Sequence, residues 1–256
     1  MNDKKRNMPY VGITGFMHAD EVAFATEQAR GSLLMVGVLA TERTLAGLPS
    51  GKPNRYPRAE DMAGIFPERG HGTLSLLHVA VSEGMPLLET LDAASVTGGK
   101  NMEGIQLNVA FPDPAALRLW KEGREPGANY LVLQCGPAMI SAADRRPRRV
   151  ARAILPYVGI ADAVLIDDSA GHGKPLDGAF VAACFEEIAD HDWDLGIGAA
   201  GGLTGESLSR LLRDPIREFG PFSIDAEGGL RRGSGDQLDF GLVTEYLEAA
   251  REAFSQ

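Results

Sequence analysis

Residues 195–208 read LGIGAAGGLTGESL, and residues 222–234 read FSIDAEGGLRRGS. Each stretch begins with a short apolar run and continues into a Gly-Gly turn. Residues 163–173, AVLIDDSAGHG, show the same order of an apolar run followed by a polar, glycine-rich turn. Apolar runs that alternate with helices are typical of parallel strands joined by right-handed crossovers, so that the C-terminal ends of the strands lie at one edge.

The same alternation extends outward from these stretches over the whole chain. Eight apolar runs predict strands at Tyr10–Thr14, Leu33–Leu39, Leu74–Val81, Gly104–Leu107, Tyr130–Leu133, Ala163–Asp167, Leu195–Gly198 and Phe222–Asp225. Helix-period segments predict helices at Ala19–Arg30, Pro112–Glu122, Arg149–Tyr157, Gly178–Ala189, Gly205–Arg213 and Asp239–Phe254. The runs are nearly continuous in apolar residues, as expected of strands that are buried on both faces.

Eight such units in 256 residues match the roughly 250 residues of a (β/α)8 barrel. We therefore predict an α/β fold, a single (β/α)8 or TIM barrel over residues 9–256, preceded by a flexible lead at residues 1–8. An open doubly wound sheet is the alternative, and the lack of a G-x-G-x-x-G motif after the first run weakens its dinucleotide-binding form. The insertion Ala40–Pro57 is rich in Gly and Pro, which predicts a loop on the active-site side of the barrel.

The chain carries 25 Lys and Arg residues against 35 Asp and Glu residues, a net charge of −10, so no basic surface for nucleic acid is expected. No apolar run approaches the roughly 20 residues that span a bilayer. The start, MNDKKRNMPY, lacks the apolar segment of a secretory signal, so we predict a cytoplasmic protein without a membrane partner. Two cysteines, Cys135 and Cys184, exclude a disulfide framework and a cysteine-rich zinc site. We predict neither a metal nor a cofactor, and the oligomeric state stays open.

Polar residues stand at the predicted C-terminal ends of the strands, where side chains of a barrel meet in one mouth. They are Thr14, Gln106, Asn108, Gln134, Asp167, Asp168 and Asp225. Two glycine pairs follow the seventh and eighth strands, where barrels commonly bind a phosphate. Because backbone N–H groups in such turns can close on an anion, they predict a phosphate site made of Gly201, Gly202, Gly228 and Gly229. The alternative is that these glycines only form turns.

Several of these segments occur in the order of one family's motifs. They are Gly12-Ile13-Thr14-Gly15, Ile105-Gln106-Leu107-Asn108, Leu165-Ile166-Asp167-Asp168-Ser169, Ala200-Gly201-Gly202-Leu203 and Ile224-Asp225-Ala226-Glu227. Over nearly its whole length the chain resembles the phosphoribosylanthranilate isomerase family of tryptophan biosynthesis. It departs from the family at the end of the first strand, where the catalytic cysteine of the family is replaced by Thr14. The resemblance is therefore to a divergent member.

The resemblance implies an Amadori rearrangement, in which a phosphorylated aminoaldose becomes an aminoketose. Such a reaction needs a general acid at the ring oxygen and a general base at C2. The family's acid falls on Asp167, whereas the hydroxyl of Thr14 does not titrate near neutral pH. Asp225, His18 and Asp20 remain as candidate bases, and Asp225 is favoured because strand ends are held more rigidly than helix-entry loops.

Other residues are candidates for binding the substrate. The resemblance assigns Arg55 to the carboxylate of anthranilate, which suits the two parallel donors of a guanidinium, and the alternative is a solvated loop arginine. Gln106, Asn108 and His172 are predicted to contact the substrate, and for His172 a role as loop filler is an equal alternative. We interpret His78 as a hydrogen-bonded interior or mouth-lining histidine and Cys135 as a small buried residue.

Three functions from different classes stay open. The first is an isomerase that acts on a phosphoribosyl-arylamine, phosphoribosylanthranilate or a related phosphorylated compound. The second is a non-catalytic barrel that binds a phosphorylated metabolite, and the third is a different phosphosugar epimerase, lyase or synthase on the same scaffold. The departures from the family, at Gly12, Thr14 and Asn108, fall on the part of the site where the reaction would take place. The matches fall on the part predicted to bind the phosphate. The sequence therefore predicts a phosphorylated small-molecule partner and leaves the reaction open.

Overall fold

The computed structural model describes residues 8–70, 72–82, 85–169, 176–211, 216, 219, 222–233 and 235–254. Eight parallel strands close into a barrel in chain order, with β8 paired to β1. They are β1 (Val11–Thr14), β2 (Leu34–Thr41), β3 (Thr73–Ala80), β4 (Gly104–Asn108), β5 (Tyr130–Cys135), β6 (Ala163–Asp167), β7 (Gly196–Ala200) and β8 (Ser223–Ala226). All eight predicted strands are present, so the (β/α)8 barrel is confirmed and the open sheet is wrong.

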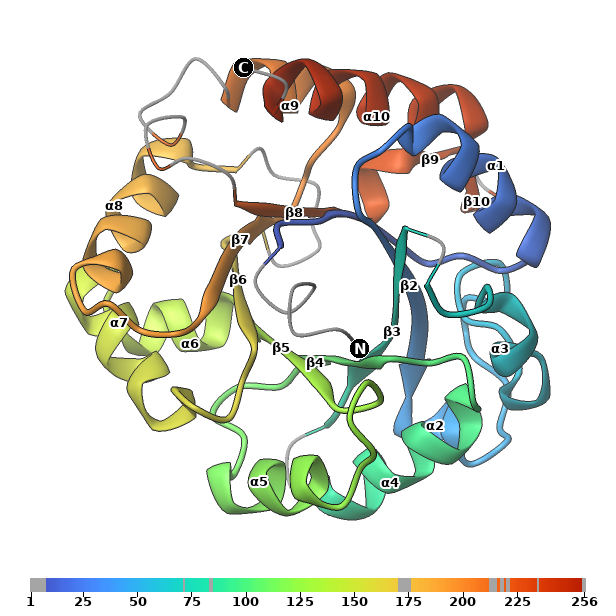
Figure 1. The fold of residues 1–256 in the computed structure, drawn as a ribbon, viewed down its shortest axis with the longest axis horizontal. Coiled ribbons are helices and arrows are strands. Elements are labelled where there is room, and N and C mark those ends of the chain that lie inside the picture. Colours follow the sequence, from blue (N-terminus) through green and yellow to red (C-terminus); the bar gives the residue numbers. More distant parts are fainter. Residues whose placement is uncertain are drawn as a thin grey trace.

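Helices form a ring around the barrel (Figure 1). They are α1 (Ala19–Ala29), α2 (Glu42–Leu45), α3 (Ala59–Ile65), α4 (Leu87–Gly98), α5 (Pro114–Glu122), α6 (Pro137–Ala142), α7 (Pro147–Ile154), α8 (Gly178–Ala189), α9 (Gly205–Leu211) and α10 (Phe240–Phe254). The 3-10 turn η2 (Leu155–Tyr157) continues α7. Between β8 and α10 lie the 3-10 turn η4 (Gly228–Leu230) and a short antiparallel hairpin of β9 (Arg231–Arg232) and β10 (Gln237–Leu238).

Each predicted helix overlaps an observed one, and Gly178–Ala189 matches α8 at both ends. The helix-period segments given above include none for α3, α4 or α6, and none of these three helices begins after a side chain that caps it. The residue before α4 is Pro86, and the residue before α6 is Gly136. Without a Ser, Thr, Asp or Asn at that position, the strongest local signal of a helix start is missing.

The prediction that Ala40–Pro57 is entirely loop is wrong at its beginning. β2 continues to Thr41, and the short helix α2 follows directly. Thr41 caps this helix, because its Oγ1 accepts a hydrogen bond from the N–H of Thr44 at 3.2 Å. The Oγ1 of Thr44 in turn accepts from the N–H of Thr41 at 2.9 Å. The reciprocal cap lacks the Glu or Gln of the usual capping box, so the sequence pattern did not reveal it.

Side chains along each strand alternate between the barrel interior and the surrounding helices. A separate buried cluster, distinct from the larger one that packs sheet against helices, consists of Tyr10, Leu33, Met35, Leu74, Leu76, Tyr130, Val132, Ala163, Leu165 and Ala200. Moving two residues along a strand keeps the same face, so His78 lies one layer beyond Leu76 and Asp167 one layer beyond Leu165. The barrel interior is therefore apolar toward the N-terminal ends of the strands and polar toward their C-terminal ends.

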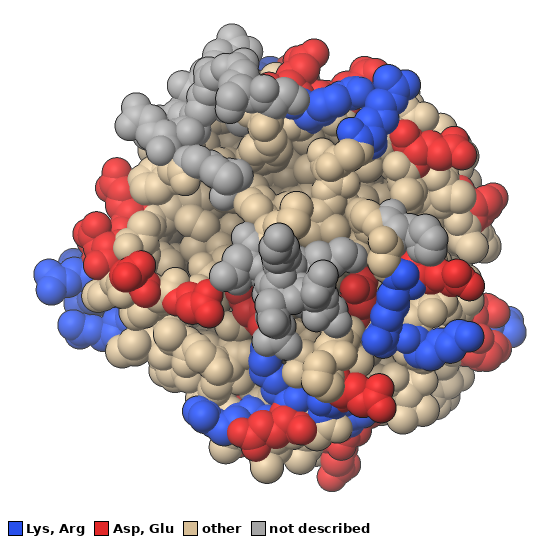
Figure 2. Space-filling model, in the orientation of Figure 1, with Lys and Arg blue, Asp and Glu red and all other residues tan. Residues whose placement is uncertain are grey.

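The surface carries mixed charge. On the face seen in Figure 2, Lys and Arg side chains alternate with Asp and Glu side chains around the rim, and neither sign gathers in one patch. Among the described residues, no helix combines the length and the apolar character needed to cross a membrane.

Candidate active site

A cavity of about 60 Å³ lies at the C-terminal ends of the strands. Its walls come from β3, β5, β6, β7 and β8, from the turns that follow the last three of these strands, and from the insertion after β2. The sequence-predicted residues that line it are Arg55, His78, Gln134, Asp167, Gly201, Gly202, Asp225, Gly228 and Gly229, whereas Thr14 and Gln106 are not part of its lining. The fold thus gathers residues that are up to about 170 positions apart in the chain, as expected for the mouth of a barrel.

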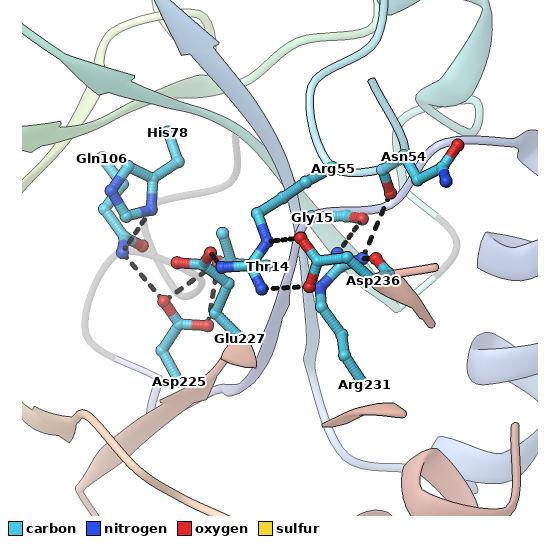
Figure 3. A network of polar contacts seen from close by, with 10 residues as sticks. All are labelled: Thr14, Gly15, Asn54, Arg55, His78, Gln106, Asp225, Glu227, Arg231 and Asp236. Carbon is cyan, nitrogen blue, oxygen red and sulfur yellow. Dashed lines mark hydrogen bonds and ion pairs between the residues drawn. The ribbon is translucent and has the colours of Figure 1, made fainter. Parts of the chain in front are cut away.

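Asp225 is the most strongly perturbed carboxyl group at this cavity, and it is only 5% exposed. The Oγ1 of Thr14 donates to it, lying 2.9 Å from Oδ1 and 3.0 Å from Oδ2, and the Nε2 of Gln106 donates to Oδ2 at 2.8 Å (Figure 3). Burial raises the pKa of Asp225 from 3.8 to about 7, although the hydrogen bonds from Gln106 and Thr14 oppose that rise. The neighbouring carboxylates of Glu227 and Asp167 raise it further. A carboxyl group with such a pKa can both take up and release a proton near neutral pH.

The side-chain amide of Gln106 links His78 to the carboxyl group of Asp225. The Nε2 of Gln106, which binds Asp225, also lies 3.2 Å from the Nδ1 of His78. Because an amide nitrogen only donates, Nδ1 is the accepting nitrogen and the proton of the neutral ring sits on Nε2. Burial lowers the pKa of His78, and Glu227 and Asp167 only partly oppose this. The imidazole is therefore neutral at neutral pH, which confirms the interpretation of an interior, hydrogen-bonded histidine.

Asp167 is held as firmly as Asp225, by different partners. The Nε2 of Gln134 donates to Oδ2 at 2.6 Å, and the N–H and Oγ of Ser169 donate to Oδ1 at 2.9 and 2.8 Å. The adjacent Asp168 instead forms an ion pair with Arg145 and is absent from the cavity lining. Of the two neighbouring carboxylates, only Asp167 belongs to the site, as the alternation of side chains at the end of a strand requires.

The glycine turns after β7 and β8 pack tightly. Gly201 has a φ of 100°, in the region that favours glycine, and a Cβ there would overlap the Oδ1 of Asp167 and the Oγ of Ser169. A Cβ at Gly229 would overlap the carbonyl oxygen of Leu203. Around Gly228, by contrast, no atom of the described residues lies within 4 Å of the Cβ position. Packing thus accounts for Gly201 and Gly229, while the open side of Gly228 leaves space for a ligand.

Arg55 reaches the cavity wall but is engaged by two carboxylates. Its Nε donates to Oδ2 of Asp236 at 2.7 Å, its Nη2 binds the other oxygen of Asp236, and its Nη1 donates to Glu227 at 2.9 Å. Arg231 donates to the backbone oxygens of Gly15, Asn54 and Asp236, joining three loops (Figure 3). We call Asn54, Arg55, Glu227, Arg231 and Asp236 the mouth clamp. It fastens the insertion after β2 to the segment after β8.

Other predicted residues lie elsewhere. His18 is exposed at the start of α1 and lines a separate cavity of about 800 Å³ beside the insertion and α3, and Asp20 is exposed in the first turn of α1. Asn108 ends β4 as an exposed residue outside the cavity lining, and His172 lies outside the described residues. Cys135 is fully buried on the helix side of the barrel, with a pKa raised by burial to about 12, which confirms it as a core residue.

Sequence reasoning missed four participants in the site. Ser169 is visible only as the residue that follows the two aspartates, with no motif that marks it as a partner of Asp167. Glu227, Arg231 and Asp236 act through contacts with Gly15, Asn54 and Arg55 that span between 172 and 216 positions of sequence. A single sequence carries no signal for such pairs. Within the described part of the chain, no three His, Cys, Asp or Glu side chains group closely enough to hold a metal ion.

The free energy of unfolding is expected to fall as the pH rises from about 4 to about 7. The folded protein keeps the Asp225 proton up to a pH of about 7, whereas the unfolded chain loses it near 3.8. Between these values the folded state binds more protons, so stability decreases by up to roughly 1.4 kcal/mol per pH unit. Urea unfolding at pH 4, 5, 6 and 7 measures this slope. The slope should be shallower in Asp225→Asn, and equal slopes in the two proteins would contradict the assignment.

The chain matches no protein-family model and no curated protein. Among solved structures, phosphoribosyl anthranilate isomerase from Thermus thermophilus is similar over 95% of this chain and 98% of its own, with a TM-score of 0.65 and 16% identity. The YdjI aldolase from Escherichia coli K12 is similar over 98% of this chain and 90% of its own, with a TM-score of 0.51 and 12% identity.

A longer protein shows the same likeness. Ribulose-1,5-bisphosphate carboxylase/oxygenase from Pyrococcus horikoshii OT3 matches 97% of this chain and 58% of its own, with a TM-score of 0.57 and 15% identity. Proteins with one barrel fold catalyse many reactions, so likeness at this level of identity does not transfer a reaction. The chain is therefore a (β/α)8 barrel, similar in fold to an isomerase, an aldolase and a carboxylase.

Proposed function

We propose that this barrel is an enzyme that isomerises a phosphorylated sugar derivative, an aldose–ketose conversion of a phosphoribosyl-arylamine or a related phosphorylated compound. The observation that carries the proposal is the pair of buried, differently held carboxyl groups, Asp225 and Asp167, at one cavity. Aldose–ketose conversion moves a proton from C2 to C1 of the sugar, and a carboxyl group with a pKa near neutrality suits that step. The reaction class is taken from phosphoribosyl anthranilate isomerase, a protein of similar fold.

In the proposed active form Asp167 carries a proton and acts as the general acid, while ionised Asp225 acts as the general base. The hydroxyl of Ser169, which can donate or accept, then accepts from the protonated Asp167. Protonation of the ring oxygen by Asp167 breaks its bond to C1 and leaves an open-chain iminium or carbonyl group. Asp225 then takes the proton from C2, which gives an enolamine or enediol. Asp225 returns this proton to C1 while the 2-hydroxyl gives its proton to Asp167, so the ketose forms and both carboxyl groups regain their starting states. Thr14 and Gln106 hold the Asp225 carboxylate in place through the hydrogen bonds described above, so that it need not reorganise during proton transfer.

The glycine turns after β7 and β8 supply the proposed phosphate site. Gly201, Gly202, Gly228 and Gly229 all line the cavity, and the side of Gly228 is open. Backbone N–H groups in such turns bind anions without a lysine or arginine. The two clamp arginines, Arg55 and Arg231, balance the two clamp carboxylates in charge, so the clamp does not repel a phosphate.

Turnover tests the proposal directly. The purified protein is incubated with phosphoribosylanthranilate, and separately with ribose 5-phosphate, and ketose products are separated by chromatography. Isomerisation of either compound that is lost in Asp167→Asn supports the enzyme. A rise in melting temperature with these compounds and no product from either would instead favour the non-catalytic, metabolite-binding alternative.

Replacing Thr14 with valine is expected to move the midpoint of the pH–rate profile to higher pH. The hydroxyl of Thr14 stabilises the ionised form of Asp225 and so holds its pKa down. Valine keeps the shape of the side chain but cannot donate, so the base gains its active form only at higher pH. The measurement is kcat/KM against pH for both proteins. An unchanged midpoint with a uniformly lower rate would mean that Thr14 acts only through packing.

A further inference from the structure

We propose that the natural ligand of this cavity is a polyhydroxylated sugar phosphate without a carboxylate, and that Arg55 serves the mouth clamp rather than a ligand carboxylate. The inference rests on the proposed function, because it specifies the ligand of the same site. It narrows the substrate to a plain aldose phosphate, as opposed to a sugar phosphate that bears a carboxylated aromatic ring. Three independent features of the cavity carry it.

The first feature is the occupation of Arg55. A guanidinium binds a carboxylate best through two parallel N–H donors. In Arg55 these two donors, Nε and Nη2, already bind the two oxygens of Asp236, and Nη1 binds Glu227. The Arg55 side chain is only 16% exposed. A ligand carboxylate would have to displace Asp236 from Arg55. The guanidinium would then form no more hydrogen bonds than it already does.

The second feature is an unused acceptor in the cavity wall. Gln134 is only 8% exposed and lines the cavity, and its Nε2 is committed to Asp167. Its Oε1 is buried and has no hydrogen-bond partner among the described residues. A buried carbonyl oxygen requires a donor. A sugar hydroxyl supplies one and a carboxylate cannot, so this acceptor favours a ligand that bears hydroxyl groups.

The third feature is size. The cavity measures about 60 Å³, whereas a cavity of roughly 150 Å³ is known to hold benzene in a protein interior. Hydroxyl-bearing carbons at the reacting end of a sugar fit the smaller space beside Asp167 and Asp225. The phosphate then lies outward, toward the open side of Gly228. An aromatic ring has no equivalent space within the cavity.

Calorimetric binding tests the inference on the folded protein with D-ribose 5-phosphate, inorganic phosphate, anthranilate and phosphoribosylanthranilate as probes. We expect D-ribose 5-phosphate to bind at least tenfold more tightly than inorganic phosphate, and no measurable binding of anthranilate. Gln134→Leu should weaken D-ribose 5-phosphate about tenfold and leave inorganic phosphate unchanged. Gln28→Leu, on the partly exposed face of α1, is the matched control and should alter neither.

Two results would overturn the inference. One is tighter binding of phosphoribosylanthranilate than of D-ribose 5-phosphate, with the preference lost in Arg55→Met. The other is a folded wild-type protein that binds D-ribose 5-phosphate no better than inorganic phosphate. The proposed isomerisation can be contradicted independently of the ligand class. Tight binding of D-ribose 5-phosphate without formation of ribulose 5-phosphate would contradict the proposed reaction and support the proposed ligand class. Turnover of phosphoribosylanthranilate that depends on Arg55 would contradict the proposed ligand class and support the proposed reaction.

Discussion

Asp225→Asn is expected to lower kcat about 10²- to 10⁴-fold, with a much smaller effect on KM, because a general base contributes to the transition state more than to binding. Asparagine fills the same space between Thr14 and Gln106 but cannot take up a proton. In the wild-type protein kcat/KM should rise about tenfold per pH unit below a pH of about 7 and level off above it, since Asp225 must be ionised to act as the base. The residual kcat/KM of Asp225→Asn should not show this increase with pH.

Asp168→Asn provides the control for this prediction. Asp168 immediately follows the proposed acid Asp167, yet its carboxylate pairs with Arg145 and does not line the cavity. The same loss of one negative charge, one residue away, should therefore leave kcat within about twofold, since it removes a surface-type ion pair worth roughly 0–1 kcal/mol. A fall of similar size in Asp168→Asn and Asp225→Asn would show that net charge, and not proton transfer, controls the rate.

The sequence predicts those parts of this molecule that depend on local patterns. All eight strands follow from apolar runs, and Asp167 and Asp225 follow from their position at the ends of two runs. Partners that belong to neighbouring strands are partly predictable, because the barrel brings strand ends together: Gln106 and Thr14 were both identified as mouth residues, although their shared contact with Asp225 was not. That contact depends on register, which a single sequence does not encode.

The mouth clamp shows where prediction from this sequence stops. Arg55 was identified as a functional arginine because a family resemblance pointed to it, and the structure gives it partners in Asp236, 181 positions away, and Glu227, 172 positions away. Both partners lie in a segment of charged residues and glycines that has no periodic pattern. An ion pair between two loops depends on how the loops cross in space, so neither loop alone reveals whether its arginine faces a ligand or another part of the chain.

Gly229→Ala is expected to destabilise the protein by about 1–3 kcal/mol, the usual cost of adding a carbon to tightly packed surroundings. The added Cβ would overlap the carbonyl oxygen of Leu203 and approach the Cγ2 of Thr204 to 2.9 Å. The carbonyl belongs to the backbone of the turn after β7, so it cannot rotate away as a flexible side chain would. Urea unfolding measures the loss, and for a chain of 256 residues it corresponds to a fall in melting temperature of roughly 2–12 °C.

Gly228→Ala is the matched comparison, one residue earlier in the same 3-10 turn. Within the described part of the chain no atom lies within 4 Å of its Cβ position, and its φ lies outside the left-handed region. Alanine should therefore change the free energy of unfolding by less than about 1 kcal/mol in either direction. If a phosphate lies against this open side, the methyl group should still reduce the rise in melting temperature that ribose 5-phosphate produces in the wild-type protein. We expect Gly228→Ala to keep its stability but to lose the stabilisation by ribose 5-phosphate, and Gly229→Ala to lose stability. This difference would show that Gly228 serves ligand binding and Gly229 serves packing. Equal destabilisation by the two variants would mean that the whole turn is packed and offers no anion site.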